Sequence, residues 1–541
     1  MVGNTTLNSQ GLYIFNKSKS QNGVNFKMGK VNLDALIPRA DFEFKEDSVQ
    51  DTTENTDKIK LSDLERKGNF FYPALRKPDF QRETNEWNPN KIKGLIESFV
   101  NQDLIPAIIM WNTKGSFTFA IDGAHRLSAL IAWVNDDYGD GVISRTFFES
   151  ISDEQKKIAD KTRKLIEFGN KIHSYKYYKD ALDNPKGIDE TIVQKARDLS
   201  RHTLQLQWVK GGSKKAEDSF FRINQEAVKI SPAELELSKA REKPNGISAR
   251  AIKNRGMGYK YWSKFTSDIQ SEIEKLSKEI YDLIFIPPLK QPIKSIDLLP
   301  LAGKSDSAYS LPLVLNFVNI VNKLMDKNIS DIQNDDEGKI TLEYLQRCKK
   351  IALKFNSIDT SSLGLHPAIY LYSSDGNYKI VSFYSTIALL LDFENNPELQ
   401  KQFTGVRKDF EKILLRYDDY ISQLVRRYRA GKKGYNHIKD FYLEIIKKLS
   451  QKETKASLMK ELKEREEEKT SKKPKEFSIS AKSAVVIKTS LKNALTCKIC
   501  GGLIDPKPRT IDHKQRKQDD GLGVIDNGQI AHPYCNSTYK N

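Results

Sequence analysis

Four potential zinc ligands lie within the last 45 residues of the 541-residue chain. Two residues separate Cys497 from Cys500, two separate His532 from Cys535, and 31 residues lie between the pairs. Zinc prefers thiolate and imidazole ligands, and four of them complete its tetrahedron without leaving a position for substrate. The spacing therefore predicts a structural zinc site that stabilises a module with a small core. A reduced Cys-x2-Cys pair beside an unrelated cysteine is the alternative.

A second group of polar residues lies between the two zinc pairs. Hydrolysis of a phosphodiester needs a base that deprotonates water and a divalent ion that holds the phosphate. Asp512 offers a hard oxygen ligand for Mg²⁺ or Mn²⁺. Because neighbouring strand residues point to opposite faces, Asp512 and His513 can both reach a phosphate only at a strand end or bend. The turn at 519–523 then predicts a hairpin whose return strand brings in Asn527, and a helix after the second zinc pair would carry Asn536 on its first turn.

These residues together resemble an HNH endonuclease, in which a ββα-metal fold is held by a zinc ribbon. The resemblance implies that His513 is the general base and Asp512 a metal ligand. It implies that Asn527 braces the hairpin, and that Asn536 is the second metal ligand of an H-N-N variant. His532 stands where the third zinc cysteine is usual. The alternative is a hydrogen-bonded Asp512–His513 pair that supports a purely structural ribbon.

Three cations follow the predicted catalytic pair: Lys514, Arg516 and Lys517. Lysine and arginine contact DNA phosphates, which position a protein without specifying sequence. We predict DNA contacts here, with a solvated basic loop as the alternative.

A third constellation lies in the N-terminal half, at 79–83, 120–126 and 220–225. Asp122 and Gly123 end a strand, and His125 and Arg126 begin a helix. Glycine lets a ligand approach the backbone, a helix N-terminus attracts anions, and arginine donates two hydrogen bonds to a phosphate. These pieces predict a phosphate or nucleotide pocket, with a turn and a capping histidine as the alternative.

The same three pieces resemble the ParB/sulfiredoxin-like N-terminal domain of GmrSD-type restriction systems and of the phosphorothioate-sensing Ssp effector. That family shows a Gln-Arg pair, then DGQHR before an apolar helix, then an FxxIN stretch. This chain has DGAHR, with Ala124 in place of glutamine, and FFRINQEAVKISPAEL fits the third element. The similarity covers about 70–240 and implies binding and hydrolysis of a nucleoside triphosphate. The matching pocket residues are Gln81, Arg82, Asp122, Gly123, His125 and Arg126.

Several elements must position these residues, and we predict an α+β multidomain protein. Asn88 and Pro89 begin a helix, 106–111 and 116–121 are strands, and Ser231-Pro-Ala-Glu begins another helix. The expected domains are listed in chain order: a polar extension (1–60), a ParB-like α/β nucleotide-binding domain (61–245), a helical domain (246–450), a charged linker helix (451–480) and a ββα-metal (HNH) zinc-ribbon domain (481–541).

The bulk composition favours a polyanionic partner. The net charge is +17, and cationic side chains gain affinity for nucleic acid by releasing counterions. No apolar run approaches the length of a membrane span, and the N-terminus lacks the pattern of a secretory signal, so we expect a cytoplasmic protein without a membrane partner. Cys348, isolated in a helical segment, is predicted to be a buried hydrophobe.

The patterns together predict a nucleotide-regulated HNH DNA endonuclease that acts as an anti-phage restriction effector on foreign or modified DNA. Its expected cofactors are Zn²⁺, Mg²⁺ or Mn²⁺ and a nucleoside triphosphate; a homo-oligomer is compatible with the sequence. One alternative is a nucleotide-switched ParB-like DNA-binding protein with a structural ribbon. The other is a nuclease toxin whose N-terminal domain binds a partner.

Overall fold

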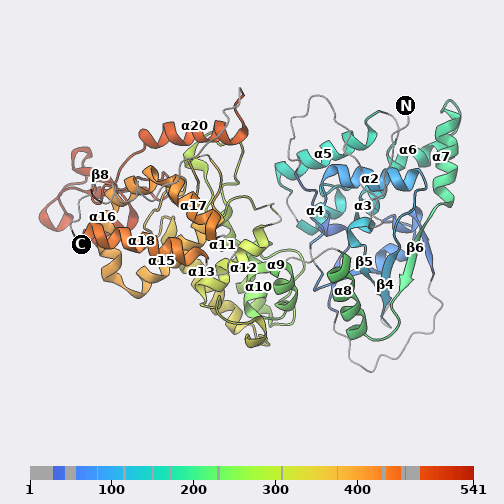
Figure 1. The fold of residues 1–541 in the computed structure, drawn as a ribbon, viewed down its shortest axis with the longest axis horizontal. Coiled ribbons are helices and arrows are strands. Elements are labelled where there is room, and N and C mark those ends of the chain that lie inside the picture. The colour runs from blue at the N-terminus through green and yellow to red at the C-terminus, as the bar shows by residue number, and fades with distance from the viewer. Residues whose placement is uncertain are drawn as a thin grey trace, which may run out of the picture.

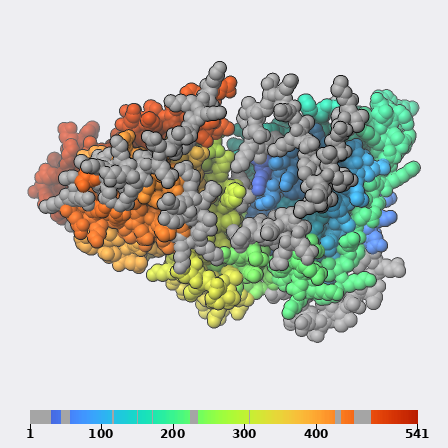
Figure 2. Space-filling model, in the orientation of Figure 1, coloured from blue at the N-terminus to red at the C-terminus, as the bar shows by residue number. Residues whose placement is uncertain are grey.

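The computed structural model shows an α+β protein that is mostly helical and contains one mixed sheet (Figure 1). It describes residues 29–42, 56–81, 83–113, 117–148, 151–169, 172–227, 232–305, 307, 309–374, 376–428, 434–451, 457 and 476–540. Chain order follows the long axis: the blue and teal N-terminal half lies at one end, and the orange and red C-terminal part lies at the other (Figure 2).

The mixed sheet has six strands in the order β1-β3-β5-β4-β6-β2. The pairs β1–β3, β3–β5 and β4–β6 are parallel, whereas β4–β5 and β2–β6 are antiparallel. The strands are β1 (Arg39–Ala40), β2 (Lys58–Lys60), β3 (Leu75–Pro78), β4 (Ile108–Asn112), β5 (Thr118–Asp122) and β6 (Thr203–Trp208).

Alternation along the strands divides the buried side chains between the two sheet faces. On β4, Ile108 and Met110 belong to one core cluster, which includes residues of α2 (Pro89–Val100) and α3 (Ala124–Asn135). Trp111 of β4 and Phe119 of β5 belong to a second cluster with Phe220 of α8 (Ser213–Ala227). Each face of the sheet is therefore covered by helices, as a buried mixed sheet requires.

The predicted helix starts and strands around the N-terminal motifs are confirmed. Asn88 accepts a hydrogen bond from the Lys91 amide at 3.0 Å and caps α2, whose first residue is Pro89. The predicted strands correspond to β4 and β5, and α3 follows directly after Gly123. The helix predicted from 231 begins at Pro232, while Ser231 lies outside the described residues.

Further helices surround the sheet and lead away from it. They are α1 (Phe71–Ala74), α4 (Val142–Phe148), α5 (Asp153–Glu167), α6 (Tyr175–Asp183), α7 (Glu190–Arg201) and α9 (Pro232–Lys239).

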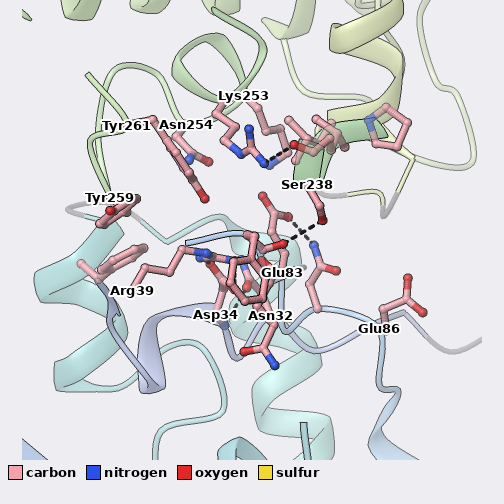
Figure 3. Close-up of a pocket in the computed structure, with 18 of the residues that line it drawn as sticks. Asn32, Asp34, Arg39, Glu83, Glu86, Ser238, Lys253, Asn254, Tyr259 and Tyr261 are labelled. Carbon is pink, nitrogen blue, oxygen red and sulfur yellow. Dashed lines mark hydrogen bonds and ion pairs between the residues drawn. The ribbon is translucent and has the colours of Figure 1, made fainter. Parts of the chain in front are cut away.

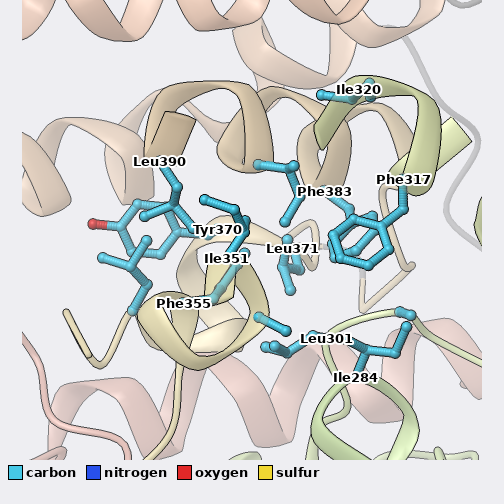
Figure 4. Packing of buried hydrophobic residues seen from close by; sticks show 14 of the residues in the cluster. Ile284, Leu301, Phe317, Ile320, Ile351, Phe355, Tyr370, Leu371, Phe383 and Leu390 are labelled. Atoms are coloured by element: carbon cyan, nitrogen blue, oxygen red, sulfur yellow. The ribbon is translucent and has the colours of Figure 1, made fainter. Parts of the chain in front are cut away.

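Beyond α9 the chain is helical and has one large apolar core (Figure 4). Phe317, Phe355 and Phe383 come from three different helices and meet there, and Cys348 is fully buried, as predicted. The helices are α10 (Pro244–Lys253), α11 (Ser267–Phe285), α12 (Ser310–Val321), α13 (Lys339–Phe355), α14 (Pro367–Tyr370), α15 (Ile380–Asn395), α16 (Pro397–Arg416), α17 (Asp418–Tyr428) and α18 (Gly434–Ser450).

The C-terminal segment packs against this helical core. Helix α20 (Ile479–Lys492) buries Ile487 in the same cluster. A two-stranded sheet follows, β7 (Thr510–His513) with β8 (Gly528–Ala531), and a π-helical turn, η7 (Cys535–Tyr539), ends the described chain. Among the described residues, no helix combines the length and the apolar character needed to cross a bilayer.

Candidate metal and nucleotide sites

The four predicted zinc ligands meet in one buried cluster, here called the clasp: Cys497, Cys500, His532 and Cys535. Their ligand atoms all lie within 4.8 Å of one another, and none of the four residues is more than 8% exposed. His532 Nδ1 lies 3.4 Å from Cys500 Sγ and 3.8 Å from Cys535 Sγ. Three thiols and an imidazole nitrogen that converge in this way fit the ligand set of a structural zinc ion.

A hydrogen bond outside the clasp fixes the orientation of the His532 ring. His532 Nε2 lies 3.0 Å from the carbonyl oxygen of Leu503, so Nε2 carries the proton and donates it. The Nδ1 lone pair is then directed toward the thiols. A metal-binding histidine usually donates the N–H of its other ring nitrogen to a protein acceptor in this way, which fixes the tautomer and the orientation of the ring.

The thiols of the clasp also perturb one another. A hydrogen bond with Cys500 lowers the pKa of Cys497, and the same contact raises the pKa of Cys500 to about 12. Several thiolates in one buried cluster repel each other unless a cation lies between them. A divalent metal removes this repulsion, which further supports a fit to zinc.

A buried ion pair of α16 holds the clasp against the helical core. Arg407, 1% exposed, donates from Nε to Glu411 Oε1 at 2.7 Å, and its Nη1 lies 3.3 Å from His532 Nδ1. Glu411 Oε2 accepts from the backbone amide of Leu503 at 2.7 Å. A Cβ at Gly502 would lie 2.6 Å from Arg407 Nε, so only glycine admits this approach. The clasp and α16 therefore share one polar network.

Asp512 lies on β7 and faces the C-terminal turn. It is 5% exposed, and its Oδ2 accepts from Gln529 Nε2 at 2.7 Å and from Lys540 Nζ at 2.8 Å. Lys540 Nζ also donates to the carbonyl oxygen of His513. The Lys540 ammonium thus contacts both the carboxylate of Asp512, the predicted metal ligand, and the carbonyl oxygen of the next residue.

His513 is the last residue of β7, where the prediction required a strand end. Its side chain is half-buried. Asn527 ends a 3-10 turn, Ile525–Asn527, and directly precedes β8, the return strand of the hairpin. Its side chain accepts from Gln515 N at 2.7 Å and donates to the Leu522 carbonyl at 2.8 Å, so it closes the loop that follows His513.

The first turn of η7 brings Asn536 to the same strand. Asn536 Nδ2 lies 3.3 Å from the Ile511 carbonyl oxygen and 3.5 Å from Thr510 Oγ1. Because Thr510 and Asp512 are two residues apart on β7, they share a face. Asp512 and Asn536 are therefore on the same side of the hairpin, with His513 at its end.

The three cations after His513 differ in their surroundings. Lys514 Nζ donates to the Asp526 carbonyl at 2.7 Å, and Arg516 donates to the carbonyl of Lys540. Lys517 is exposed. Arg516 thus contributes to the packing of the C-terminal turn, which sequence reasoning did not anticipate.

The DGAHR motif occupies the connection between β5 and α3. Asp122 is the last residue of β5, and Gly123 has φ +88° and no side chain to cap α3. Arg126 Nη2 donates to Asp122 Oδ2 at 2.7 Å and to the Ala107 carbonyl at 3.3 Å. The His125 ring lies 6.0 Å from the Trp87 ring. The motif therefore presents a helix N-terminus without a side-chain cap beside an ion-paired arginine.

The DFQRE motif lies next to this connection. Gln81 is 8% exposed, and its Nε2 donates to the Ile121 carbonyl at 3.3 Å. Arg82 lies outside the described residues, as do the side chains of Asn224 and Gln225 in the third motif. Phe220 and Phe221 of that motif pack against Phe80. The structure thus brings all three motifs together near the carboxyl ends of β3 and β5.

Residues 53–241 match the model of a family described as GmrSD restriction endonuclease, N-terminal domain. This GmrSD_N region contains the sheet strands β2 to β6 and the three motifs. The match confirms that this region resembles the N-terminal domain of GmrSD-type restriction endonucleases. No curated protein and no solved structure matches the chain.

The sequence analysis missed several residues around these sites. Arg407 and Glu411 form a charged i,i+4 pair, which is usually a surface feature. A signal was nevertheless present, because Phe403, Phe410 and Leu414 place this pair on the apolar face of α16. Lys540 carried no comparable signal.

Proposed function

We propose that this protein is a nucleotide-regulated HNH endonuclease that cuts foreign or modified DNA as an anti-phage restriction effector. The observation that carries the proposal is the hairpin beside the clasp: His513 ends β7, Asp512 and Asn536 share one side of it, and Asn527 closes the loop. The match of the GmrSD_N region to a restriction endonuclease family supports DNA as the partner.

In this proposal His513 removes a proton from the attacking water. A half-buried imidazole at a strand end is accessible to water, and histidine is the side chain that most often serves as a general base. Asn527 keeps the loop after His513 closed and thereby orients the base. Lys514 and Lys517 lie nearby as phosphate contacts.

Asp512 and Asn536 would hold Mg²⁺ or Mn²⁺. The ion supplies charge stabilisation for the phosphate and the leaving oxygen. The donor set fits a hard cation, because both side chains offer oxygen ligands. The Lys540 ammonium lies against the Asp512 carboxylate and the backbone carbonyl of His513, which indicates that this position favours positive charge.

The nucleotide site would involve Gln81, Arg82, Asp122, Gly123, His125 and Arg126. The N-terminus of α3 has no side-chain cap, and such termini bind phosphate groups. Arg126 is 18% exposed in its side chain and would exchange its contact with Asp122 for a phosphate.

One observation favours a second candidate, a DNA-binding protein with a structural ribbon. The Asp512 carboxylate is 5% exposed and is held by Gln529 and Lys540, as a purely structural residue would be. Substitution of Asp512 by alanine separates the two candidates. It abolishes cleavage in a nuclease and leaves nucleotide-dependent DNA retention unchanged in a binding protein.

The proposal is tested by digesting modified and unmodified phage DNA with and without each nucleoside triphosphate. The wild-type protein and His513→Ala are compared in Mg²⁺. We expect cleavage by the wild type alone, with a rate that depends on the nucleotide. Equal cleavage by both proteins would remove His513 from the mechanism.

A further inference from the structure

A cavity of about 80 Å³ lies at the seam between the GmrSD_N region and the helical region (Figure 3). One wall comes from the N-terminal half and includes Arg39, Gln81 and Glu83. The opposite wall comes from α10 and the chain after it and includes Arg250, Lys253 and Tyr261. This seam cavity is large enough for a few water molecules or a phosphate group.

Three buried side chains of the seam cavity each have one polar atom without a hydrogen-bond partner among the described residues: Arg39 Nε, Gln81 Oε1 and Arg250 Nη1. Gln81 and Arg250 are 8% and 6% exposed. A buried polar group without a partner is costly, and three around one cavity call for a ligand that supplies hydrogen bonds. The two arginine atoms are donors and Gln81 Oε1 is an acceptor, so the ligand must carry acceptors together with a hydroxyl donor, as hydrogen phosphate does.

The charges at the seam also favour a ligand that carries negative charge. Arg39 and Lys77 share a single buried carboxylate, that of Asp34, at 3.1 Å and 2.6 Å. Burial lowers the pKa of Lys77 to about 8, which leaves it mainly protonated at neutral pH. The Arg250 guanidinium lies over the Tyr261 ring at 4.3 Å, and its Nη2 donates to the Leu237 carbonyl at 2.7 Å. Asp34 is paired directly with two of these cations, while Glu83 attracts Arg39 and Lys77 and Asp79 attracts Arg250 without a hydrogen bond, so the three buried cations are only partly balanced.

The other acids nearby offset only part of this excess. Asp79 is paired with Arg241 at 3.3 Å. Glu83 is half-buried and accepts from Asn85 at 2.7 Å, and Glu86 is partly exposed and lies 3.7 Å from Lys30. Buried cations without counter-charges are strongly disfavoured, so an anion stabilises the seam.

We propose that the seam cavity binds a phosphate group, held by Arg250 from the helical side and by Arg39 from the sheet side. The phosphate is either free or part of a nucleotide. The proposal rests on the proposed nucleotide site only through Gln81, which lines the seam cavity and whose Nε2 donates to the Ile121 carbonyl of β5. Because the walls belong to two regions, occupancy couples the GmrSD_N region to the helical region.

The test measures binding by calorimetry to inorganic phosphate, ATP, GTP and guanosine. Variants of the full-length protein are Arg250→Gln and, in case that variant does not fold, Lys253→Gln, whose side chain is only half-buried. The matched control is Arg347→Gln, which removes an exposed arginine of α13. Arg126→Gln reports on the DGAHR connection.

We expect the wild type and Arg347→Gln to bind phosphate or a triphosphate equally, and Arg250→Gln or Lys253→Gln to bind it about tenfold or more weakly. Tight binding of inorganic phosphate identifies a free phosphate, whereas binding of triphosphates alone identifies a nucleotide. Loss of binding in Arg126→Gln with full binding in both seam variants would overturn the seam proposal and keep the nucleotide site. No binding of any probe, or guanosine bound as tightly as GTP, would also overturn it. The cleavage test of His513 is independent of all these outcomes.

Discussion

Two buried arginines illustrate how differently the two ends of the molecule are built. Arg407, beside the clasp, has acceptors for Nε, Nη1 and Nη2: Glu411 and the carbonyls of Leu363 and Gly364. Arg250, at the seam, has an acceptor for Nη2 but none among the described residues for Nη1. Both are nearly inaccessible to solvent. A fully partnered arginine stabilises the fold, whereas an incompletely partnered one in a cavity is suited to a ligand.

The comparison also distinguishes two kinds of coupling. The clasp is attached to α16 through direct hydrogen bonds, so the C-terminal segment and the helical region are one structural unit at that point. At the seam, direct contacts such as Tyr261 OH to the Asp79 carbonyl at 2.9 Å and Ser238 Oγ to the Phe80 carbonyl at 2.8 Å lie around a cavity. A ligand at the seam therefore has room to change how the two regions associate.

The largest effect is expected from a clasp ligand. Cys500→Ser should abolish stoichiometric zinc and expose the C-terminal segment to proteolysis, since the folding of small zinc modules depends on the metal. Elemental analysis and limited proteolysis measure both. Cys348→Ala, a buried cysteine outside the clasp, should retain one zinc per chain. Full zinc retention in Cys500→Ser would refute the clasp.

Breaking the ion pair that supports the clasp should have the next largest effect. Arg407→Gln leaves Glu411 buried without its counter-charge, which costs roughly 3–5 kcal/mol. We expect faster zinc loss to a chelator and a lower melting temperature. Arg347→Gln breaks an exposed pair of the same spacing, with Glu343, and should cost less than about 1 kcal/mol. Equal effects of the two variants would show that the Arg407 network is unimportant.

Asn527 offers a test confined to the catalytic loop. Asn527→Ala removes hydrogen bonds to Gln515 and Leu522, so we expect cleavage to fall by about 10- to 100-fold with zinc content unchanged. The control is Asp526→Ala, an exposed neighbour. If the two variants cleave alike, Asn527 has no role in orienting His513.

The smallest effect is expected at the seam, from Asp79. Burial raises the pKa of Asp79 to about 6 from a usual 3.8. Because the folded-state pKa is higher than the unfolded value, its contribution to stability is complete below the unfolded pKa and is lost as pH rises through 6. Asp79→Asn should therefore melt a few degrees higher than the wild type at about pH 8, and the difference should shrink near pH 4.

Scanning calorimetry at both pH values measures this shift. The exposed Asp336→Asn serves as the control. A melting temperature of Asp79→Asn at or below that of the wild type at pH 8 would show that the Asp79 charge does not destabilise the folded protein.

Local patterns in the sequence predicted the elements that carry the motifs. The Asn88-Pro89 start of α2, the strands before Gly123 and the hairpin from Asp512 depend on neighbouring residues, and all are present. The clasp was predictable because zinc chemistry restricts both ligand type and spacing.

Contacts between distant segments were not predictable in the same way. Arg407 and His532 are 125 residues apart, and the seam cavity joins Arg39 to Arg250. Local periodicity in the sequence does not predict such a contact. Lys540 against Asp512 is similar, since a lysine near the C-terminus is ordinarily expected in solvent.

The central claim, that the C-terminal hairpin is a hydrolytic site, is tested most directly by the nicking rate of supercoiled plasmid in Mg²⁺. The zinc-loaded wild type, His513→Ala and the control Arg347→Gln, which changes an exposed residue of α13, are compared with the required nucleotide present. We predict that His513→Ala nicks at least about 100-fold more slowly, while Arg347→Gln stays within a few fold of the wild type. A nicking rate of His513→Ala equal to that of the wild type would contradict the claim.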